Sequence, residues 1–203
     1  MKHTLIIACA AALLLTACIP SVNPFYTDKD VVFETQLVGI WQMIESGNQP
    51  ETWKFGHSSN KVYDLTVTDN EGRKGQFHAT LFRLEEQLFL DLIPTDCEFA
   101  TNQNELVAAS MFPGHLLMHV AQIEPELRLA FCDFDWLENH LKDNPEALAH
   151  LIEEKRILLT ASTSDLQRFV LKYLNNGELF DDYSNLKKQS ANQSEGVTAP
   201  IEN

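Results

Sequence analysis

The feature that most constrains the fold is a series of short segments with the periodicity of β-strands, separated by turn signals. In residues 62–68, the apolar side chains of Tyr63, Leu65 and Val67 alternate with polar ones. This two-residue period is typical of an antiparallel strand with one buried face. The segment Asp69-Asn70-Glu71-Gly72 follows it and has the composition of a tight turn. The chain is therefore expected to be mainly β.

Two pairs of apolar runs predict hairpins. Residues 75–84 and 87–93 flank the polar pair Glu85-Glu86, and a second pair flanks Glu124-Pro125-Glu126. The second hairpin comprises residues 115–123 and 127–134. The other strand candidates are residues 37–44, 51–55, 62–68 and 156–160. About eight antiparallel strands in sequential order predict an up-and-down β-barrel. Its interior is either a small ligand cavity or a core filled by side chains.

Helical patterns begin after the seventh strand candidate. Residues 136–141 have apolar side chains at helical spacing, and residues 145–152 follow an N-cap at Asn144 with Pro145 at the first helical position. Residues 164–174 form the clearest helix, with one continuous apolar face. We expect two or three α-helices towards the C-terminus.

The start of the helix at 164–174 fits a capping box. Ser164 would cap the helix, and Gln167 would reach back to it. Residues 34–186 are expected to form a single barrel-like domain with these helices at its end. From Lys187 to Asn203 the chain is rich in Ser, Asn, Gln and Gly, which predicts a disordered tail.

The charge balance limits the partners of the chain. It has 15 Lys and Arg residues against 29 Asp and Glu, for a formal net charge of -14. This excess of negative charge argues against nucleic-acid binding and against adsorption to anionic lipid. With 44% hydrophobic residues and 12 Phe, the chain has enough apolar side chains for a core.

The first 17 residues have the layout of a secretory signal. A short basic start is followed by an uncharged apolar run from Leu5 to Leu15, which at about 16 Å as a helix is too short to span a bilayer. The run ends in Leu15-Thr16-Ala17-Cys18, which resembles the lipobox of bacterial lipoproteins. The resemblance implies removal of residues 1–17 and attachment of lipid to Cys18. The alternative is an ordinary secretory signal cleaved after Ala17.

The resemblance also implies a location and a membrane partner. A lipidated Cys18 would anchor the chain through its acyl chains, with residues 18–33 as a tether that contains Phe25 and Tyr26. In the lipoprotein pattern, the absence of Asp after the cysteine points to the outer membrane, and here that residue is Ile19. The domain would then face the periplasm.

Two further cysteines belong to the expected mature chain. Cys97 and Cys132 would lie in an oxidising compartment, where they form either a disulfide or two buried thiols. In the chain-entropy model such a disulfide would contribute about 3–4 kcal/mol. Two cysteines at this spacing do not make a zinc site, and we expect neither a metal nor a cofactor.

The triplet Gly39-Ile40-Trp41 near the start of the β region resembles the G-x-W of the lipocalins and related barrels. The resemblance implies that Trp41 closes one end of the barrel and that Gly39 allows the backbone to bend. The chain also resembles an uncharacterised group of bacterial lipoproteins, and that resemblance implies no activity. Its segments are Asn23-Pro24-Phe25-Tyr26, Phe89-Leu90-Asp91-Leu92, Asp135-Trp136-Leu137 and the run from Leu159 to Phe169.

Few residues suggest catalysis. His115 and His119 are four apart, and on a strand they would lie about 13 Å from each other, too far for one metal ion. The hairpin would bring His115 near Asp135, as either an acid–base pair or a structural hydrogen bond. Asp133 and Asp135 are either paired carboxylates or caps of a turn. The phosphate-loop, H-E-x-x-H, G-x-S-x-G and C-x-x-C motifs are absent from the sequence.

Three functions remain compatible with the sequence. The first is an anchored, non-catalytic barrel that binds a small apolar or amphipathic ligand in a hollow interior. The second is a structural or assembly lipoprotein with a filled barrel and an exposed apolar patch for an envelope protein. The third is a hydrolase, which would require a buried carboxylate or histidine in a cleft.

Overall fold

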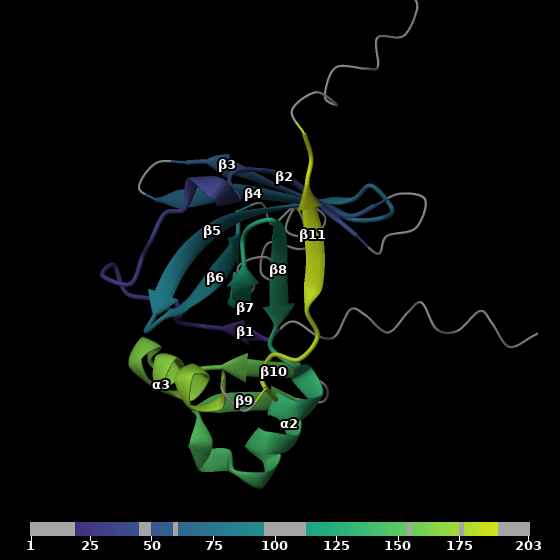
Figure 1. Ribbon diagram of the computed structural model, residues 1–203. Helices are drawn as coiled ribbons and strands as arrows, with labels where there is room; N and C mark the ends of the chain where they lie inside the picture. The colour runs from purple at the N-terminus through teal and green to yellow at the C-terminus, as the bar shows by residue number, and fades with distance from the viewer. Residues whose placement is uncertain are drawn as a thin grey trace, which may run out of the picture.

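The computed structural model describes residues 19–44, 50–58, 61–95, 113–153, 156–174 and 177–190. In these ranges the chain forms a closed barrel of eight antiparallel strands, with two α-helices and a small extra sheet on one side of it (Figure 1). The prediction of a mainly β barrel with helices towards the C-terminus is confirmed. Among the described residues, no helix is both long and apolar enough to cross a bilayer.

Each barrel strand pairs antiparallel with its neighbours, and the β6–β7 and β11–β2 pairings close the ring. Both predicted hairpins are present, as is the alternating strand at 62–68. The barrel strands are β2 (Gly39–Met43), β3 (Thr52–His57), β4 (Val62–Thr68), β5 (Lys74–Leu84), β6 (Gln87–Pro94), β7 (His115–Gln122), β8 (Glu126–Phe131) and β11 (Ser184–Lys188).

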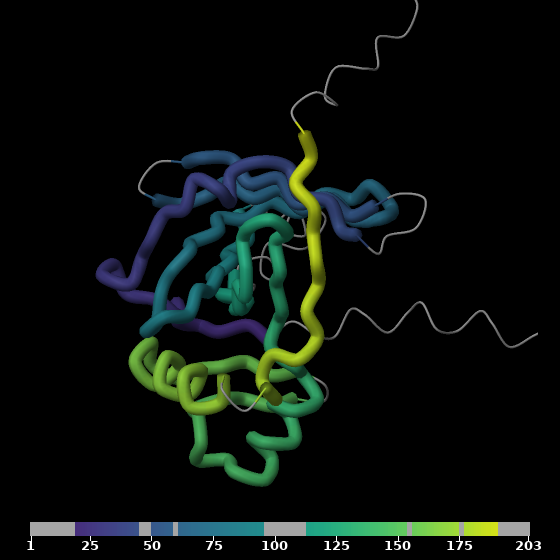
Figure 2. Tube along the Cα trace, viewed as in Figure 1, coloured from purple at the N-terminus to yellow at the C-terminus, as the bar shows by residue number. Residues whose placement is uncertain are grey.

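The eighth barrel strand is not the one that the sequence predicts. The segment at 156–160 forms β10 (Arg156–Leu159), which lies outside the barrel. The place between β8 and β2 is taken by β11, where Leu186 lies opposite both Leu127 and Met43. Figure 2 shows the chain returning from the helical side along the barrel wall to form this strand. The predicted tail from Lys187 therefore begins too early, because Lys187 and the residue after it belong to β11. Residues 191–203 lie outside the described ranges.

The predicted helix at 145–152 is also wrong. A short 3-10 helix, η3 (Pro145–Ala147), is followed by the strand β9 (His150–Glu153), which pairs with β10. Leu151 is 62% exposed, so it does not belong to a buried helical stripe. The strand forms because β10 satisfies its backbone groups, a tertiary interaction that local periodicity does not reveal.

The small sheet connects the N-terminal segment to the barrel. The strand β1 (Pro20–Ser21) pairs antiparallel with β7 and parallel with β10. Ser21 lies opposite His115 on one side and Leu159 on the other, and it is completely buried. A 3-10 helix, η1 (Thr35–Leu37), leads from this segment into β2. The sheet order beyond the barrel is thus β7–β1–β10–β9, with β9 at the edge.

The two α-helices begin at capped positions. In α2 (Phe134–Asp143), the Asp133 side chain accepts a hydrogen bond from the Trp136 amide at 2.5 Å. In α3 (Thr163–Leu174), the cap is Ser162 rather than the predicted Ser164. The Ser162 Oγ accepts from the Asp165 amide at 3.3 Å and donates to the Asp165 carboxylate at 2.6 Å.

Gln167 does not complete the predicted capping box. Its side-chain amide donates to the Phe25 carbonyl at 3.0 Å and to the Asp30 carboxylate at 2.9 Å. Gln167 therefore ties α3 to the N-terminal segment, whose Phe25 is 2% exposed. Residues 19–33 pack on the domain and do not form a free tether.

Two hydrophobic cores meet at the barrel wall. The first fills the interior of the barrel. The second lies between the outer face of β5–β8 and the layer made by α2, α3 and the small sheet. Along β6, for example, Leu90 and Leu92 point into the barrel while Phe89 and Asp91 face the second core. Alternate residues of one strand therefore serve both cores.

Candidate functional site

The barrel interior, where a ligand cavity was one expectation, is occupied by side chains. All eight barrel strands contribute, and Trp41, Tyr63 and Phe55 are each less than 2% exposed. Two cavities in the described part of the chain are lined by residues outside this interior. The buried interior residues are Leu37, Trp41, Trp53, Phe55, Tyr63, Leu65, Ala79, Leu81, Leu90, Leu92, Met118, Val120, Leu127, Leu129 and Leu186.

The G-x-W segment lies where the end of β11 pairs with the start of β2, with Lys188 opposite Trp41. The Trp41 ring is fully buried, and its Nε1 donates to the Leu37 carbonyl at 2.8 Å. The Lys188 ammonium lies 5.0 Å from the centre of this ring and donates to the Gln36 carbonyl at 2.5 Å. Gly39 has φ +141°, and a Cβ there would lie 2.8 Å from Lys188 Cε. Only glycine fits this backbone without displacing the lysine.

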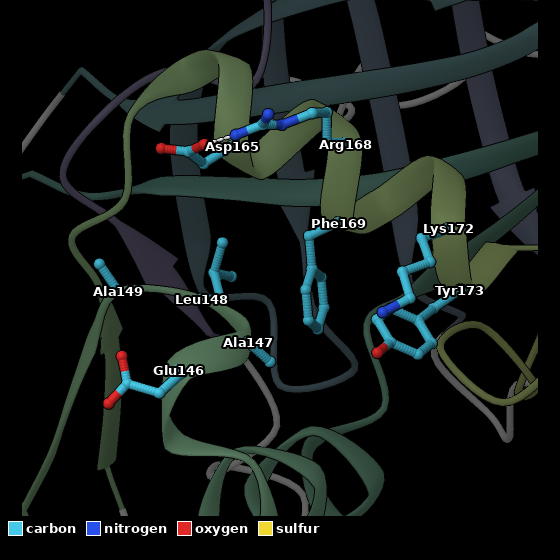
Figure 3. Close-up of a pocket in the computed structure, with 9 residues that line it drawn as sticks. All are labelled: Glu146, Ala147, Leu148, Ala149, Asp165, Arg168, Phe169, Lys172 and Tyr173. Atoms are coloured by element: carbon cyan, nitrogen blue, oxygen red, sulfur yellow. Dashed lines mark hydrogen bonds and ion pairs between the residues drawn. The ribbon is translucent and has the colours of Figure 1, made fainter.

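A pocket of about 390 Å³ lies outside the barrel, between α3 and the segment that begins with η3 (Figure 3). Leu148 and Phe169 are almost fully buried and form its apolar base. Charged side chains surround this base. The lining residues are Glu146, Ala147, Leu148, Ala149, Asp165, Arg168, Phe169, Lys172 and Tyr173.

Helical spacing explains why α3 presents charged and aromatic groups together. Positions three and four apart share one side of a helix, which brings Asp165, Arg168 and Lys172 to the pocket rim. The Arg168 guanidinium forms an ion pair with the Asp165 carboxylate. The Lys172 ammonium lies 4.8 Å from the centre of the Tyr173 ring. The pocket therefore offers an apolar base next to a lysine that lies over an aromatic ring.

An aromatic cluster connects α2 with Phe169 and Tyr173, the two aromatic residues that line the pocket. Trp136 and His140 of α2 are stacked with their ring centres 4.8 Å apart, and Tyr173 meets His140 edge-on at 4.6 Å. Phe169 packs against Tyr173 at 4.7 Å. The His140 Nε2 is buried and has no hydrogen-bond partner among the described residues. An unsatisfied buried nitrogen is uncommon in a protein core, and this ring packs against Phe169 and Tyr173, which line the pocket.

His115 pairs with Asp91, and the predicted pairing with Asp135 is wrong. The His115 Nδ1 lies 2.7 Å from the Asp91 carboxylate, whose other oxygen accepts from the Phe25 amide at 2.9 Å. Asp135 is exposed in the first turn of α2 and Asp133 caps that helix, so the two are not paired carboxylates. Asp91 is 2% exposed, and it holds the N-terminal segment against the barrel. A charged residue inside the apolar run Leu88–Ile93 was the sequence signal for it.

No nucleophile in the described contacts serves the His115–Asp91 pair. Ser21 is the cross-strand neighbour of His115, but its Oγ accepts from the Asn23 amide at 3.2 Å. The hydrogen bonds of Asp91 thus join the N-terminal segment to β6, and β6 to His115 of β7. We interpret His115, Asp91 and Ser21 as the attachment of the N-terminal segment to β6 and β7.

His119 lies on the same outer side of β7 but has different partners. Its Nδ1 accepts from the Tyr183 hydroxyl at 2.6 Å, and its Nε2 donates to the Gln87 amide oxygen at 3.2 Å. Burial lowers the pKa of His119 to about 4, and the nearby Arg128 guanidinium contributes to the shift. This arrangement fits a neutral ring with its proton on Nε2. In the described ranges, no three His, Cys, Asp or Glu side chains converge as metal ligands.

Acidification should destabilise the protein through His119. The pKa of the folded ring, about 4, is below its ordinary value of 6.5, so between these values the unfolded chain binds a proton that the folded chain does not. Stability should therefore fall as the pH drops through this window, by roughly 2–3 kcal/mol from His119 alone. Urea unfolding across the window should show a smaller pH dependence in His119→Gln than in the wild type. Equal slopes would contradict the buried neutral ring.

The cysteine predictions fall largely outside the described residues. Cys18 and Cys97 are not among them, so neither the lipid attachment nor the Cys97–Cys132 disulfide is tested. Cys132 is half-buried and packs against the core between the barrel and the helices. The lipid attachment and the disulfide both stay predictions.

Comparisons of the chain with protein-family models, curated proteins and solved structures found no match. The pocket between η3 and α3, with the adjoining aromatic cluster, is thus identified by its geometry alone. The pocket is lined by residues 146–149 and by residues of α3, and no sequence pattern predicts that these two segments lie side by side. The apolar spacing in residues 145–152 and 164–174 is local to each segment, so it does not predict that the two segments face one another across a cavity.

Proposed function

We propose that the protein is a membrane-anchored, periplasm-facing lipoprotein without catalytic activity, which binds a small amphipathic ligand. The binding site proposed is the pocket between η3 and α3, not the barrel interior. The observation that carries this choice is the filled interior: Trp41, Tyr63 and Phe55 occupy the space that a carrier would leave for its ligand. The barrel then serves as a rigid support.

The pocket favours a ligand with an apolar part and an anionic group. Its volume, about 390 Å³, is in the range of small-molecule sites. Leu148 and Phe169 offer apolar contact, and Lys172 offers a positive charge. Arg168 contributes less because Asp165 already neutralises it. A carboxylate or phosphate attached to an acyl or aromatic group fits this arrangement.

Membrane anchoring is the other part of the proposal. It is supported by the lipobox-like Leu15-Thr16-Ala17-Cys18 at the end of an apolar run of the right length. The absence of Asp after Cys18 supports the outer membrane as the location. The acidic chain, at -14, adds no electrostatic attraction to anionic lipid, so the acyl chains would supply the attachment.

The second candidate function is assembly with an envelope protein. It is favoured by the same filled interior, which is what a scaffold requires, and by the mixed charges at the pocket rim. Glu146, Asp165, Arg168 and Lys172 would then meet complementary groups of a partner. In that case the pocket would accept a side chain of the partner in place of a free ligand.

Native mass spectrometry separates these functions. The Cys18→Ala protein is exported with an unrelated cleavable signal and purified from the periplasm without detergent. We expect a small-molecule adduct near one-to-one stoichiometry. In Lys172→Glu the affinity for the ligand should fall roughly tenfold or more, because a charge-assisted contact contributes about 1.5–3 kcal/mol, and the adduct peak should be clearly reduced.

Lys54→Glu is the matched control for this experiment. It makes the same charge change on the exposed outer side of β3, away from the pocket. The adduct should persist in this variant. A bare chain mass in the wild type would contradict ligand binding. Photo-crosslinking from position 172 in the intact envelope would then test for a protein partner.

A further inference from the structure

The small sheet has one face that the rest of the described protein does not cover. Along β1, β10 and β9, side chains alternate between the buried side, with Ser21 and Leu159, and an outer side. On the outer side, Leu151 is 62% exposed and Val22 is 38% exposed. Leu158, the cross-strand partner of Leu151, is half-buried there. We call Pro20, Val22, Leu151 and Leu158 the outer apolar face.

The register of β1 places the first described residues, Ile19 and Pro20, beside this face. Because β1 runs parallel to β10 with Ser21 beside Leu159, the start of β1 lies at the same end of the small sheet as Arg156, where β10 begins. Ile19 is buried in the core, with only 6% of its surface exposed. Cys18 is therefore joined by a single peptide bond to a residue of the folded domain. The acyl chains would therefore hold the domain directly at the bilayer.

The distance between Leu151 and the lipid attachment point follows from the spacing of the strands. Leu151 lies two strands away from Pro20, which is about 10 Å, and Cys18 is at most about 7 Å along the chain from Pro20. Leu151 thus lies within roughly 17 Å of the attachment point. A lipid on Cys18 would therefore hold Leu151 close to the same leaflet, because no part of this path exceeds the size of the small sheet itself.

We propose that the outer apolar face rests on the leaflet that holds the Cys18 acyl chains, with Leu151 inserted among the lipid headgroups. This inference rests on the lipid anchoring proposed above. We expect lipid to cover the outer apolar face because no free linker separates the anchor at Cys18 from this face. At the anchored end of the sheet, the exposed Arg156 of β10 lies opposite the exposed Glu153 of β9, so the contact proposed for this face is made by its apolar side chains. The pocket on α3 would then have a defined orientation above the membrane.

Photo-crosslinking of the lipidated protein in its own envelope tests this orientation. The full chain carries p-benzoylphenylalanine in place of Leu151 or, as the control, in place of Lys54. Lys54 is exposed on β3, which in the ring of eight strands lies opposite β7 and its neighbour β1. Because both positions are exposed, the fold should tolerate the replacements, and circular dichroism of the purified proteins checks this.

After irradiation, mass spectrometry of the purified protein reports phospholipid adducts and, from its N-terminal peptide, the acylation of Cys18. We expect roughly tenfold more lipid adduct at position 151 than at position 54, because only an interfacial group contacts lipid persistently. If Cys18 is acylated and the two positions react equally, the face does not rest on the membrane. Protein adducts at position 151 would also overturn the inference in favour of a protein partner. An N-terminal peptide without acyl chains would overturn the anchoring itself, and this inference with it.

Discussion

Removal of β11 should prevent the barrel from forming. A chain that ends at Tyr183 keeps the His119 contact but loses the strand that joins β8 to β2. Two strand edges and the interior would then be open to water, and Leu186, which is 1% exposed, would be missing from the core. We expect the loss to exceed the total stability of an ordinary domain, about 5–15 kcal/mol, so that cooperative unfolding disappears.

Urea titration followed by tryptophan fluorescence measures this effect. A chain that ends at Ser190 is the control, because it keeps every described contact of β11 and should unfold like the full chain. Leu186→Asp provides a graded version, since an unpaired charge at this buried position should cost roughly 3 kcal/mol or more. A shortened chain with an unchanged midpoint would show that β11 is dispensable.

The second large effect is expected from Trp41→Ala. The ring is fully buried in the barrel interior, where Lys188 covers it and its Nε1 bonds to Leu37. Removing a buried tryptophan side chain costs about 3–5 kcal/mol through lost burial and the remaining cavity. The free energy of unfolding from urea titration should fall by this amount.

Trp41→Phe is the matched control, because it keeps an aromatic ring and removes only the larger ring and its donor. Its cost should be clearly smaller, about 1–2 kcal/mol. The pair of variants also tests whether the interior is filled. If the interior were hollow, the alanine variant would lose little packing, and a change below about 1 kcal/mol would contradict the filled barrel.

Sequence patterns predict few of the polar contacts and pocket-lining residues described above. His119 was noticed, but its partner Tyr183 lies 64 residues away along the chain. Asp91 was not among the residues that the sequence analysis selected, although it is a carboxylate within an apolar strand, and its contact with the Phe25 amide depends on the packing of the N-terminal segment. The pocket unites Leu148 with Phe169, and no local pattern links those two positions.

Local interactions determined the elements that the sequence alone predicts. Residues 62–68 alternate because one face of β4 is buried, and the turns at Glu85-Glu86 and Glu124-Pro125-Glu126 join neighbouring strands. These signals arise within a few residues, so they were sufficient for a barrel wall of seven strands and for α2 and α3. Tertiary structure alone decided which segment closes the ring. In β11 a single apolar residue, Leu186, lies among polar ones, and only the open edges of β8 and β2 give its backbone partners. The same reason holds for β9, which is a strand and not a helix because β10 lies beside it.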